Sequence, residues 1–197
     1  MTMISASPLV IDDSTALTGG QVAARARREH MRSPLQLAVV DHLHEMGRPG
    51  KNEASELGEN ARSLKRMARD LGIPVILLVQ LNRGNLARSD KRPNLGDLRG
   101  SGAIEEIADV VLLLHREEYY DAGTHLKGVV EVILGKGRDL PAGSTLHLEA
   151  QLPQMRMAEW EGSLPLPLSD GAPGKKRGGG MQREIPPADW RDVGGDR

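Results

Sequence analysis

The sequence predicts an α/β fold built on a mostly parallel β-sheet with helices on both faces. Short apolar runs typical of buried strands cover residues 35–40, 73–79, 110–114 and 129–134. In the N-terminal half, segments with apolar residues at helical spacing separate these runs. Continuous Val, Ile and Leu runs that alternate with helices are typical of parallel strands covered on both faces.

The N-terminal part predicts a short strand and a capped helix. Residues 9–11 are a strand candidate that ends at Asp12 and Asp13. Thr18 and Gln21 have the Thr-x-x-Gln spacing of a capping box, which predicts a helix that begins there and reaches about His30.

The strongest helix pattern follows the loop that contains Gly47, Pro49 and Gly50. One apolar stripe recurs at helical spacing, and its members are Leu57, Ala61, Leu64, Ala68 and Leu71. Acidic residues lie in the first half and basic residues in the second, as the helix dipole favours. Gly72 and Pro74 predict the end of the helix. Near the end of the folded part, residues 146–149 and 155–160 predict a terminal β-hairpin.

Composition divides the chain into two parts. Residues 162–197 contain eight Gly and five Pro, a share above the level of about 25–30% that indicates disorder. We therefore expect a folded domain over residues 1–161 and a disordered Gly/Pro-rich tail over residues 162–197.

Composition also excludes several classes of protein. The absence of cysteine excludes disulfides, cysteine zinc sites and thiol catalysis. No apolar run approaches the roughly 20 residues of a membrane span, and no secretory signal is evident, so we expect a cytoplasmic protein without membrane contact. The net charge of −1 excludes a strongly basic coat protein, although residues 62–92 carry a net +6. With no Phe, two Tyr and two Trp, binding of single-stranded nucleic acid would depend on phosphate contacts.

Two polar residues mark a candidate nucleotide site. Asp41 directly follows the run 37–40, and Gln80 directly follows the run 75–79. If these strands are parallel, both side chains lie at the edge where ligands bind such sheets. Asp41 would then hold the Mg²⁺ of a bound nucleotide, as a Walker B aspartate does, and Gln80 would sense a γ-phosphate or position water. The alternative is that each residue is an ordinary turn or helix cap.

A phosphate-binding loop of the form Gly-x-x-x-x-Gly-Lys-[Ser/Thr] is absent from the sequence. The nearest approach is the segment 47–52, whose first Gly is two residues too close and whose Asn52 replaces the hydroxyl residue. His42, His44 and Glu45 also suggest a metal site, but no third ligand beside the two His rings is evident nearby.

Several motifs occur in one order along residues 8–160. They are Pro8-Leu9-Val10-Ile11-Asp12-Asp13, Gln80-Leu81-Asn82-Arg83, Asp90-Lys91-Arg92-Pro93, Asp97-Leu98-Arg99-Gly100-Ser101-Gly102, Arg116-Glu117-Glu118-Tyr119-Tyr120 and Lys136-Gly137-Arg138-Asp139. With these motifs the chain resembles the second half of the motor domain in replicative hexameric DNA helicases of the bacterial DnaB family. That resemblance implies a partial RecA-like three-layer sandwich.

The resemblance also implies functional roles. Asp41 matches the Walker B aspartate, and Gln80 matches the glutamine that couples the γ-phosphate to the DNA loop. Lys136 and Arg138 match the pair that reaches the neighbouring subunit's ATP as an arginine finger. DNA contacts are implied for Arg83, Arg99, Gly100, Ser101 and Gly102. Arginine suits phosphate because it is planar and permanently charged, and glycine lets a backbone approach a phosphate chain closely.

The sequence departs from the family pattern at several positions. The family's phosphate-binding loop and catalytic glutamate lie upstream of the position of Pro8. Gly100 stands where the family usually has an acidic residue, and Gly137 stands inside the Lys-x-Arg pair where glutamine is common. His42 and His44 replace Tyr and Gln.

These observations predict a fragment of a replicative DNA helicase, whose family unwinds DNA in the 5′–3′ direction with ATP and Mg²⁺ in a hexameric ring on single-stranded DNA. Alone, the chain is expected not to hydrolyse ATP, because positioning of the phosphates supplies most of phosphoryl-transfer catalysis. Two alternatives stay open. The chain could be a non-enzymatic module that docks on a helicase ring through its arginine-finger face, or a single-stranded DNA binder.

Overall fold

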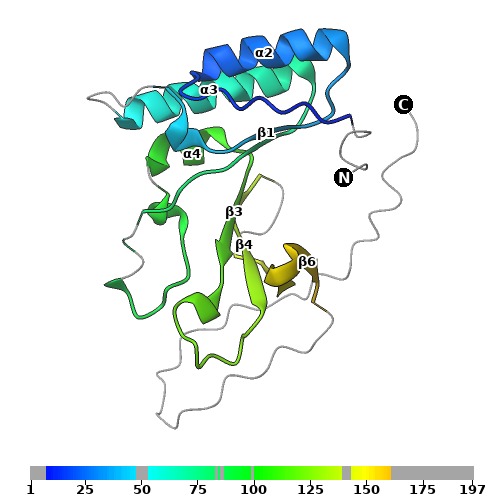
Figure 1. Cartoon of the computed structure of the whole chain (residues 1–197). Coiled ribbons are helices and arrows are strands. Elements are labelled where there is room, and N and C mark those ends of the chain that lie inside the picture. Colours follow the sequence, from blue (N-terminus) through cyan, green and yellow to red (C-terminus); the bar gives the residue numbers. More distant parts are fainter. Residues whose placement is uncertain are drawn as a thin grey trace. The chain divides into compact units, whose positions relative to one another are not determined.

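The computed structural model describes residues 8–47, 53–82, 84, 87–98, 100–138 and 143–160 (Figure 1). The predicted tail over residues 162–197 lies outside these ranges, and so does the boundary at residue 161. None of the described helices has both the length and the apolar character needed to cross a bilayer.

The described residues form three α-helices: α2 (Gly19–Arg32), α3 (Glu53–Leu71) and α4 (Ser101–Ile107). The capping box of α2 is confirmed, since Thr18 N–H donates to Gln21 Oε1 at 2.9 Å and the Thr18 hydroxyl accepts from Gln21 N–H at 3.3 Å. The predicted end of α3 is also confirmed, with Gly72 in the left-handed region at φ +64°. Short 3-10 turns complete the helical elements: η1 (Leu43–Glu45), η3 (Leu95–Asp97), η4 (Glu117–Tyr119) and η5 (Leu152–Gln154).

Helices α2 and α3 lie side by side (Figure 1). Their contact is close at Gly19, where an added Cβ would lie 2.6 Å from the backbone oxygen of Asn60. The buried Asn60 side chain accepts the Gly19 N–H at 2.8 Å, which satisfies a donor in the first turn of α2. The apolar core between these helices and the sheet contains Ala23, Leu64 and Met67. Met67 is fully buried although the predicted stripe does not include it.

The strands of the described ranges form two sheets. β1 (Ala38–Val40) and β2 (Val75–Leu77) pair in parallel, with Val39 opposite Ile76. The second sheet is antiparallel and has the order β3 (Val110–His115), β4 (Val129–Gly137), β5 (Thr145–Gln151) and β6 (Arg156–Glu159). The predicted terminal hairpin is confirmed as β5–β6.

The pairing of β3 and β4 differs from the sequence prediction. We expected the runs 110–114 and 129–134 to join a parallel sheet, but they pair antiparallel. A parallel pair needs a crossover connection, usually a helix. The connecting residues 116–128 contain only the short turn η4, so the chain turns back instead.

Two other expectations also differ. Residues 9–11 form no strand, and their side chains are exposed. No described strand pairs with them, so the apolar run lacks a ladder partner.

The strands β1, β2 and β3 are covered on one face only: Val39, Ile76 and Leu112 are 59%, 52% and 58% exposed. Burial in β3 therefore alternates along the strand, as in a half-covered antiparallel sheet.

Candidate functional site

The predicted nucleotide residues lie at one edge of the parallel pair. Asp41 directly follows β1, and Gln80 lies three residues beyond β2, past the carboxyl end of each strand. The two segments remain connected beyond the sheet, because Leu43 N–H donates to Leu78 O at 3.0 Å and Gln80 N–H donates to His44 Nδ1 at 3.4 Å. The structure therefore brings these two predicted residues to the same sheet edge.

The Asp41 side chain is exposed at this edge. Within the described part of the chain, neither a hydrogen bond nor an ion pair engages its carboxylate. An oxygen donor in that state fits Mg²⁺, which prefers carboxylates and water.

The segment after Asp41 carries two histidines. The Asp41–His42 peptide bond is cis. The rings of His42 and His44 are 5.9 Å apart at an angle of 61°. Among the described residues, no group of three possible ligands forms around this pair.

The predicted DNA loop is described only in part. Arg83 and Arg99 lie outside the described residues, as does the side chain of Ser101. Gly100 precedes α4 with φ +76°, a conformation that favours glycine, and an added Cβ would lie 3.1 Å from Leu57 Cδ1. Gly102 is exposed, and no atom lies within 4 Å of the position that an added Cβ would take. The backbone at Gly102 is therefore open to close approach by a ligand, whereas the missing side chain of Gly100 makes room for Leu57.

An ion pair positions the chain before this loop. Arg88 donates to both carboxylate oxygens of Asp97, at 3.0 and 2.6 Å, and to the backbone oxygen of Arg92 at 2.9 Å. The Arg88 guanidinium holds the pKa of the buried Asp97 carboxyl below its usual value. Asn82 N–H also donates to Asp97 O at 2.7 Å. Segments 80–82 and 94–98 are thereby held together beside the glycine loop.

The positive charge of residues 62–92 is partly neutralised by acidic residues from other segments. Arg88 pairs with Asp97, Arg92 pairs with Glu131 at 3.0 Å, and Lys65 pairs with Asp109. Three of the cations counted in the net +6 are thus engaged within the fold. The local charge count overestimates the charge available for phosphate.

Lys136 and Arg138, the predicted arginine-finger pair, lie at the C-terminal end of β4. Lys136 Nζ donates to the backbone oxygens of Glu105 and Glu106 at the C-terminal end of α4. Arg138 is 76% exposed, and its only described ion pair is with Asp109 at 3.6 Å. Lys136 is therefore anchored on the fold, whereas Arg138 projects into solvent. Within the described ranges, no hydrogen bond or ion pair links this pair to Asp41 or Gln80.

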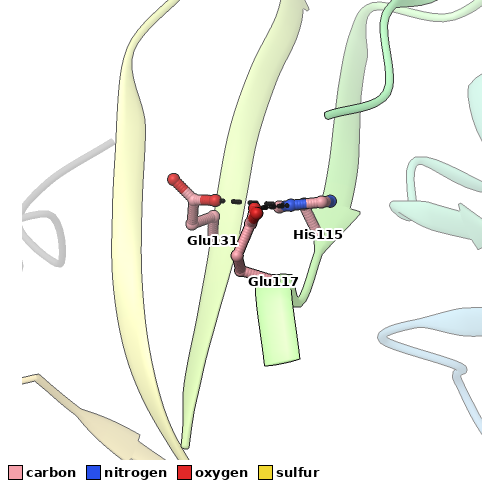
Figure 2. Close-up of side chains that lie close together, drawn as sticks. All are labelled: His115, Glu117 and Glu131. Carbon is pink, nitrogen blue, oxygen red and sulfur yellow. Dashed lines mark hydrogen bonds and ion pairs between the residues drawn. The ribbon is translucent and has the colours of Figure 1, made fainter. Parts of the chain in front are cut away.

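A second polar group was missed by the sequence analysis. His115, Glu117 and Glu131 converge on the antiparallel sheet with their ligand atoms within 4.8 Å of one another (Figure 2). Glu131 is widely separated from the other two in sequence, and only the strand register brings them together. No local spacing signal could have identified this group.

Comparison with known proteins identifies relatives of one kind. The model of the family described as "DnaB-like helicase C terminal domain" matches residues 1–158. The replicative DNA helicase DnaB of Buchnera aphidicola subsp. Acyrthosiphon pisum is 45% identical over 139 residues, which are 69% of this chain and 30% of that protein. The replicative DNA helicase DnaC of Bacillus subtilis is 40% identical over 147 residues, which are 73% of this chain and 32% of that protein. The chain thus spans about a third of the length of these relatives.

Solved structures agree with this comparison. A DnaB-like replicative helicase, described with its interactions with primase, matches with a TM-score of 0.74 and 33% identity over 80% of this chain and 38% of that one. A second solved structure, described as an ATPase domain, matches with a TM-score of 0.75 and 33% identity over 80% of this chain and 57% of that one. The RadB recombinase, at 18% identity and a TM-score of 0.50 over 73% of this chain and 59% of that one, shows likeness of fold alone. The predicted α/β, RecA-like fold class is confirmed, and the chain belongs to the DnaB-like helicase C-terminal domain family.

Proposed function

We propose that this chain forms part of a replicative DNA helicase motor and contributes to both its ATP site and its DNA-binding surface. The parallel pairing of β1 with β2 carries the proposal, because it places Asp41 and Gln80 at one sheet edge. Ligands of parallel sheets bind beyond the carboxyl ends of the strands. Membership in a helicase family supports the same assignment.

In this proposal each polar residue of the edge has a distinct task. Asp41 holds the Mg²⁺ that accompanies ATP, and Gln80 couples the γ-phosphate to the loop that contains Gly100 and Gly102. The fixed frame formed by Arg88 and Asp97 supports that coupling, because it joins the segment after Gln80 to the segment before Gly100. Single-stranded DNA contacts this loop through its phosphates.

Residues 1–197 contain no Gly-x-x-x-x-Gly-Lys-[Ser/Thr] motif, so in this proposal the phosphate-binding loop and the catalytic glutamate come from elsewhere in the helicase motor. Arg138 acts on the ATP of a neighbouring subunit. Its 76% exposure supports this role, because a residue that acts on a neighbour must project from its own fold.

A chimera tests the proposal. Residues 8–160 of this chain replace the matching segment of the Bacillus subtilis relative, and ATP hydrolysis is measured with and without single-stranded DNA. We expect DNA-stimulated hydrolysis that Arg138→Ala lowers by about 10³-fold or more, the typical contribution of an arginine finger. Asp41→Ala should abolish turnover while the thermal unfolding midpoint stays unchanged.

The unmodified chain provides the matched control. Alone, it should neither bind nor hydrolyse ATP. Hydrolysis by the chimera that persists in Asp41→Ala would refute the role of Asp41. Hydrolysis by the chain alone that Asp41→Ala abolishes would show that another segment, with residues 47–51 as the first candidate, holds the phosphates.

A second candidate function is a non-enzymatic module that docks on an intact helicase ring. The exposed Arg138 favours it, because the finger face is available to a neighbouring subunit. In that case the purified chain, added to the intact Bacillus subtilis relative, should inhibit its ATP hydrolysis. The Arg138→Ala variant should inhibit less.

A further inference from the structure

A row of ligand-type residues crosses three strands on one face of the antiparallel sheet. His115 of β3 is paired directly with Glu131 of β4, and Glu131 is paired directly with His147 of β5. Opposed residues of antiparallel strands have Cβ atoms about 4.5–5.5 Å apart. Glu117, in the turn η4, reaches the same row from the end of β3 (Figure 2).

The donor atoms of His115, Glu117 and Glu131 lie within 4.8 Å of one another, and His147 lies beside Glu131. His115 Nε2 lies 2.7 Å from Glu117 Oε2 and 3.8 Å from Glu131 Oε2, and His147 Nε2 lies 3.6 Å from Glu131 Oε1. Around a tetrahedral zinc ion with bonds of about 2.0–2.2 Å, neighbouring donors lie about 3.3–3.5 Å apart. Three of these ligands, His115, Glu117 and Glu131, already lie within 4.8 Å of one another, whereas the His147 ring must turn toward them to reach the same ion.

Two members of the row are buried with unsatisfied polar atoms. The side chains of His115 and Glu131 are 1% and 8% exposed. Glu131 Oε2, which faces His115, accepts no well-aligned hydrogen bond. Burial of a carboxylate oxygen is costly unless a donor or cation satisfies it.

Arg92 is the cation that lies against these carboxylates. Its guanidinium lies 3.0 Å from Glu131 Oε2 and 4.0 Å from Glu117 Oε2. The one positive charge of this guanidinium faces the two carboxylates of Glu117 and Glu131. The Arg92 side chain is 40% exposed, which leaves it room to move out toward solvent.

We propose that His115, Glu117, Glu131 and His147 bind one Zn²⁺ as a closed structural site that ties β3, β4 and β5 together, and that Arg92 occupies the place of the ion in its absence. Two imidazoles and two carboxylates are ligands that Zn²⁺ accepts. Four protein ligands leave no open position, which is the arrangement of structural rather than catalytic zinc. This site is independent of the proposed nucleotide edge.

Metal titration of the untagged full chain tests the proposal. After removal of metal with a chelator, Zn²⁺ is titrated by calorimetry, and Co²⁺ serves as a visible reporter of tetrahedral coordination. We expect one ion per chain. At a free Zn²⁺ concentration of 100 times Kd, the thermal unfolding midpoint should rise by about 5–10 °C.

Matched variants distinguish Zn²⁺ binding at this site from Zn²⁺ binding by other histidines of the chain. Glu117→Gln and His147→Gln, which change the less buried ligands, should each weaken binding by more than the roughly 10–100-fold cost of outer-shell changes. His125→Gln, at an exposed histidine outside the row, should bind as the unchanged chain does. Circular dichroism checks that each variant is folded.

Arg92→Gln distinguishes a metal site from a permanent ion-pair network. If Arg92 competes with the ion, its removal should tighten Zn²⁺ binding. The proposal is overturned if the unchanged chain and Arg92→Gln both fail to bind Zn²⁺. It is equally overturned if Glu117→Gln and His147→Gln bind as strongly as the unchanged chain, or if binding is lost only when His42 and His44 are replaced.

Discussion

At the scale of single residues, charge pairs decide which basic side chains are available to a ligand. Arg88 belongs to the basic segment 62–92 and Lys136 to the predicted arginine-finger pair, yet both are engaged within the fold, Arg88 with Asp97 and Lys136 with the end of α4. Arg138 remains exposed. The distinction between framework and ligand-facing residues therefore depends on contacts between distant segments, not on residue type.

The Arg88–Asp97 pair should make stability depend on pH in the acid range. The Arg88 guanidinium depresses the pKa of Asp97 below its usual value in the folded chain. The stabilisation is then present above the unfolded pKa of about 3.9 and is lost as the pH falls through the folded value. Thermal unfolding from about pH 6 to pH 2 should show a smaller acid-induced loss of midpoint for Asp97→Asn than for the unchanged chain.

Glu159→Gln is the matched control for that measurement, since Glu159 is an exposed carboxylate on β6. It should retain the acid sensitivity of the unchanged chain. Equal acid sensitivity in Asp97→Asn and the unchanged chain would contradict the assignment.

At the scale of elements, the packing of α2 on α3 depends on the absence of a side chain at one position. Gly19 lies against the backbone of Asn60, whereas at Gly20 the nearest atom to an added Cβ is Thr18 Oγ1 at 3.9 Å. These neighbouring glycines have the same helical context but different surroundings. They form a natural matched pair.

Gly19→Ala should destabilise the chain by about 1–3 kcal/mol, because overpacking forces the two helices apart. Gly20→Ala should be neutral or stabilising by up to about 1 kcal/mol, because alanine favours the helix. Urea unfolding of both variants measures the difference. Equal free energies of unfolding for the two variants would show that the close contact between α2 and α3 at Gly19 does not restrict the side chain there.

The elements also show how far local pattern predicts structure. The capping box of α2 and the end of α3 at Gly72 depend on residues within about one helical turn, and both are confirmed. Of the predicted stripe of α3, Leu57, Ala61 and Leu64 are buried, and Ala68 and Leu71 are half-buried. The direction in which β3 and β4 pair depends on the connection and on distant partners. That pairing was predicted wrongly.

At the scale of the whole molecule, the sheets keep apolar side chains exposed. On β3 and β5, Leu114 and Leu146 are 63% and 66% exposed on the face opposite the His115 row, and both are paired with Val132. On the parallel pair, Val39 and Ile76 are exposed opposite each other. Large exposed apolar patches mark surfaces that associate with other protein.

The isolated chain should therefore self-associate. Leu114→Lys combined with Leu146→Glu should lower the average mass measured by light scattering after size exclusion, because charge on the strand face opposes stacking of sheets. Replacement of the exposed Met31 on α2 by Lys is the control and should leave the mass unchanged. A monomeric unchanged chain would contradict this prediction.

The amino-acid sequence by itself determined the capping box of α2, the end of α3, the terminal hairpin and the placement of Asp41 and Gln80 after neighbouring strands, whereas α4 was not predicted. These features depend on interactions over a few residues, whose spacing can be read directly. Only the tertiary structure decided the antiparallel order of β3 to β6, the engagement of Arg88 and Arg92, and the row formed by His115, Glu131 and His147. Strand register decides these contacts, because a shift of one residue would move every side chain to the other face of the sheet.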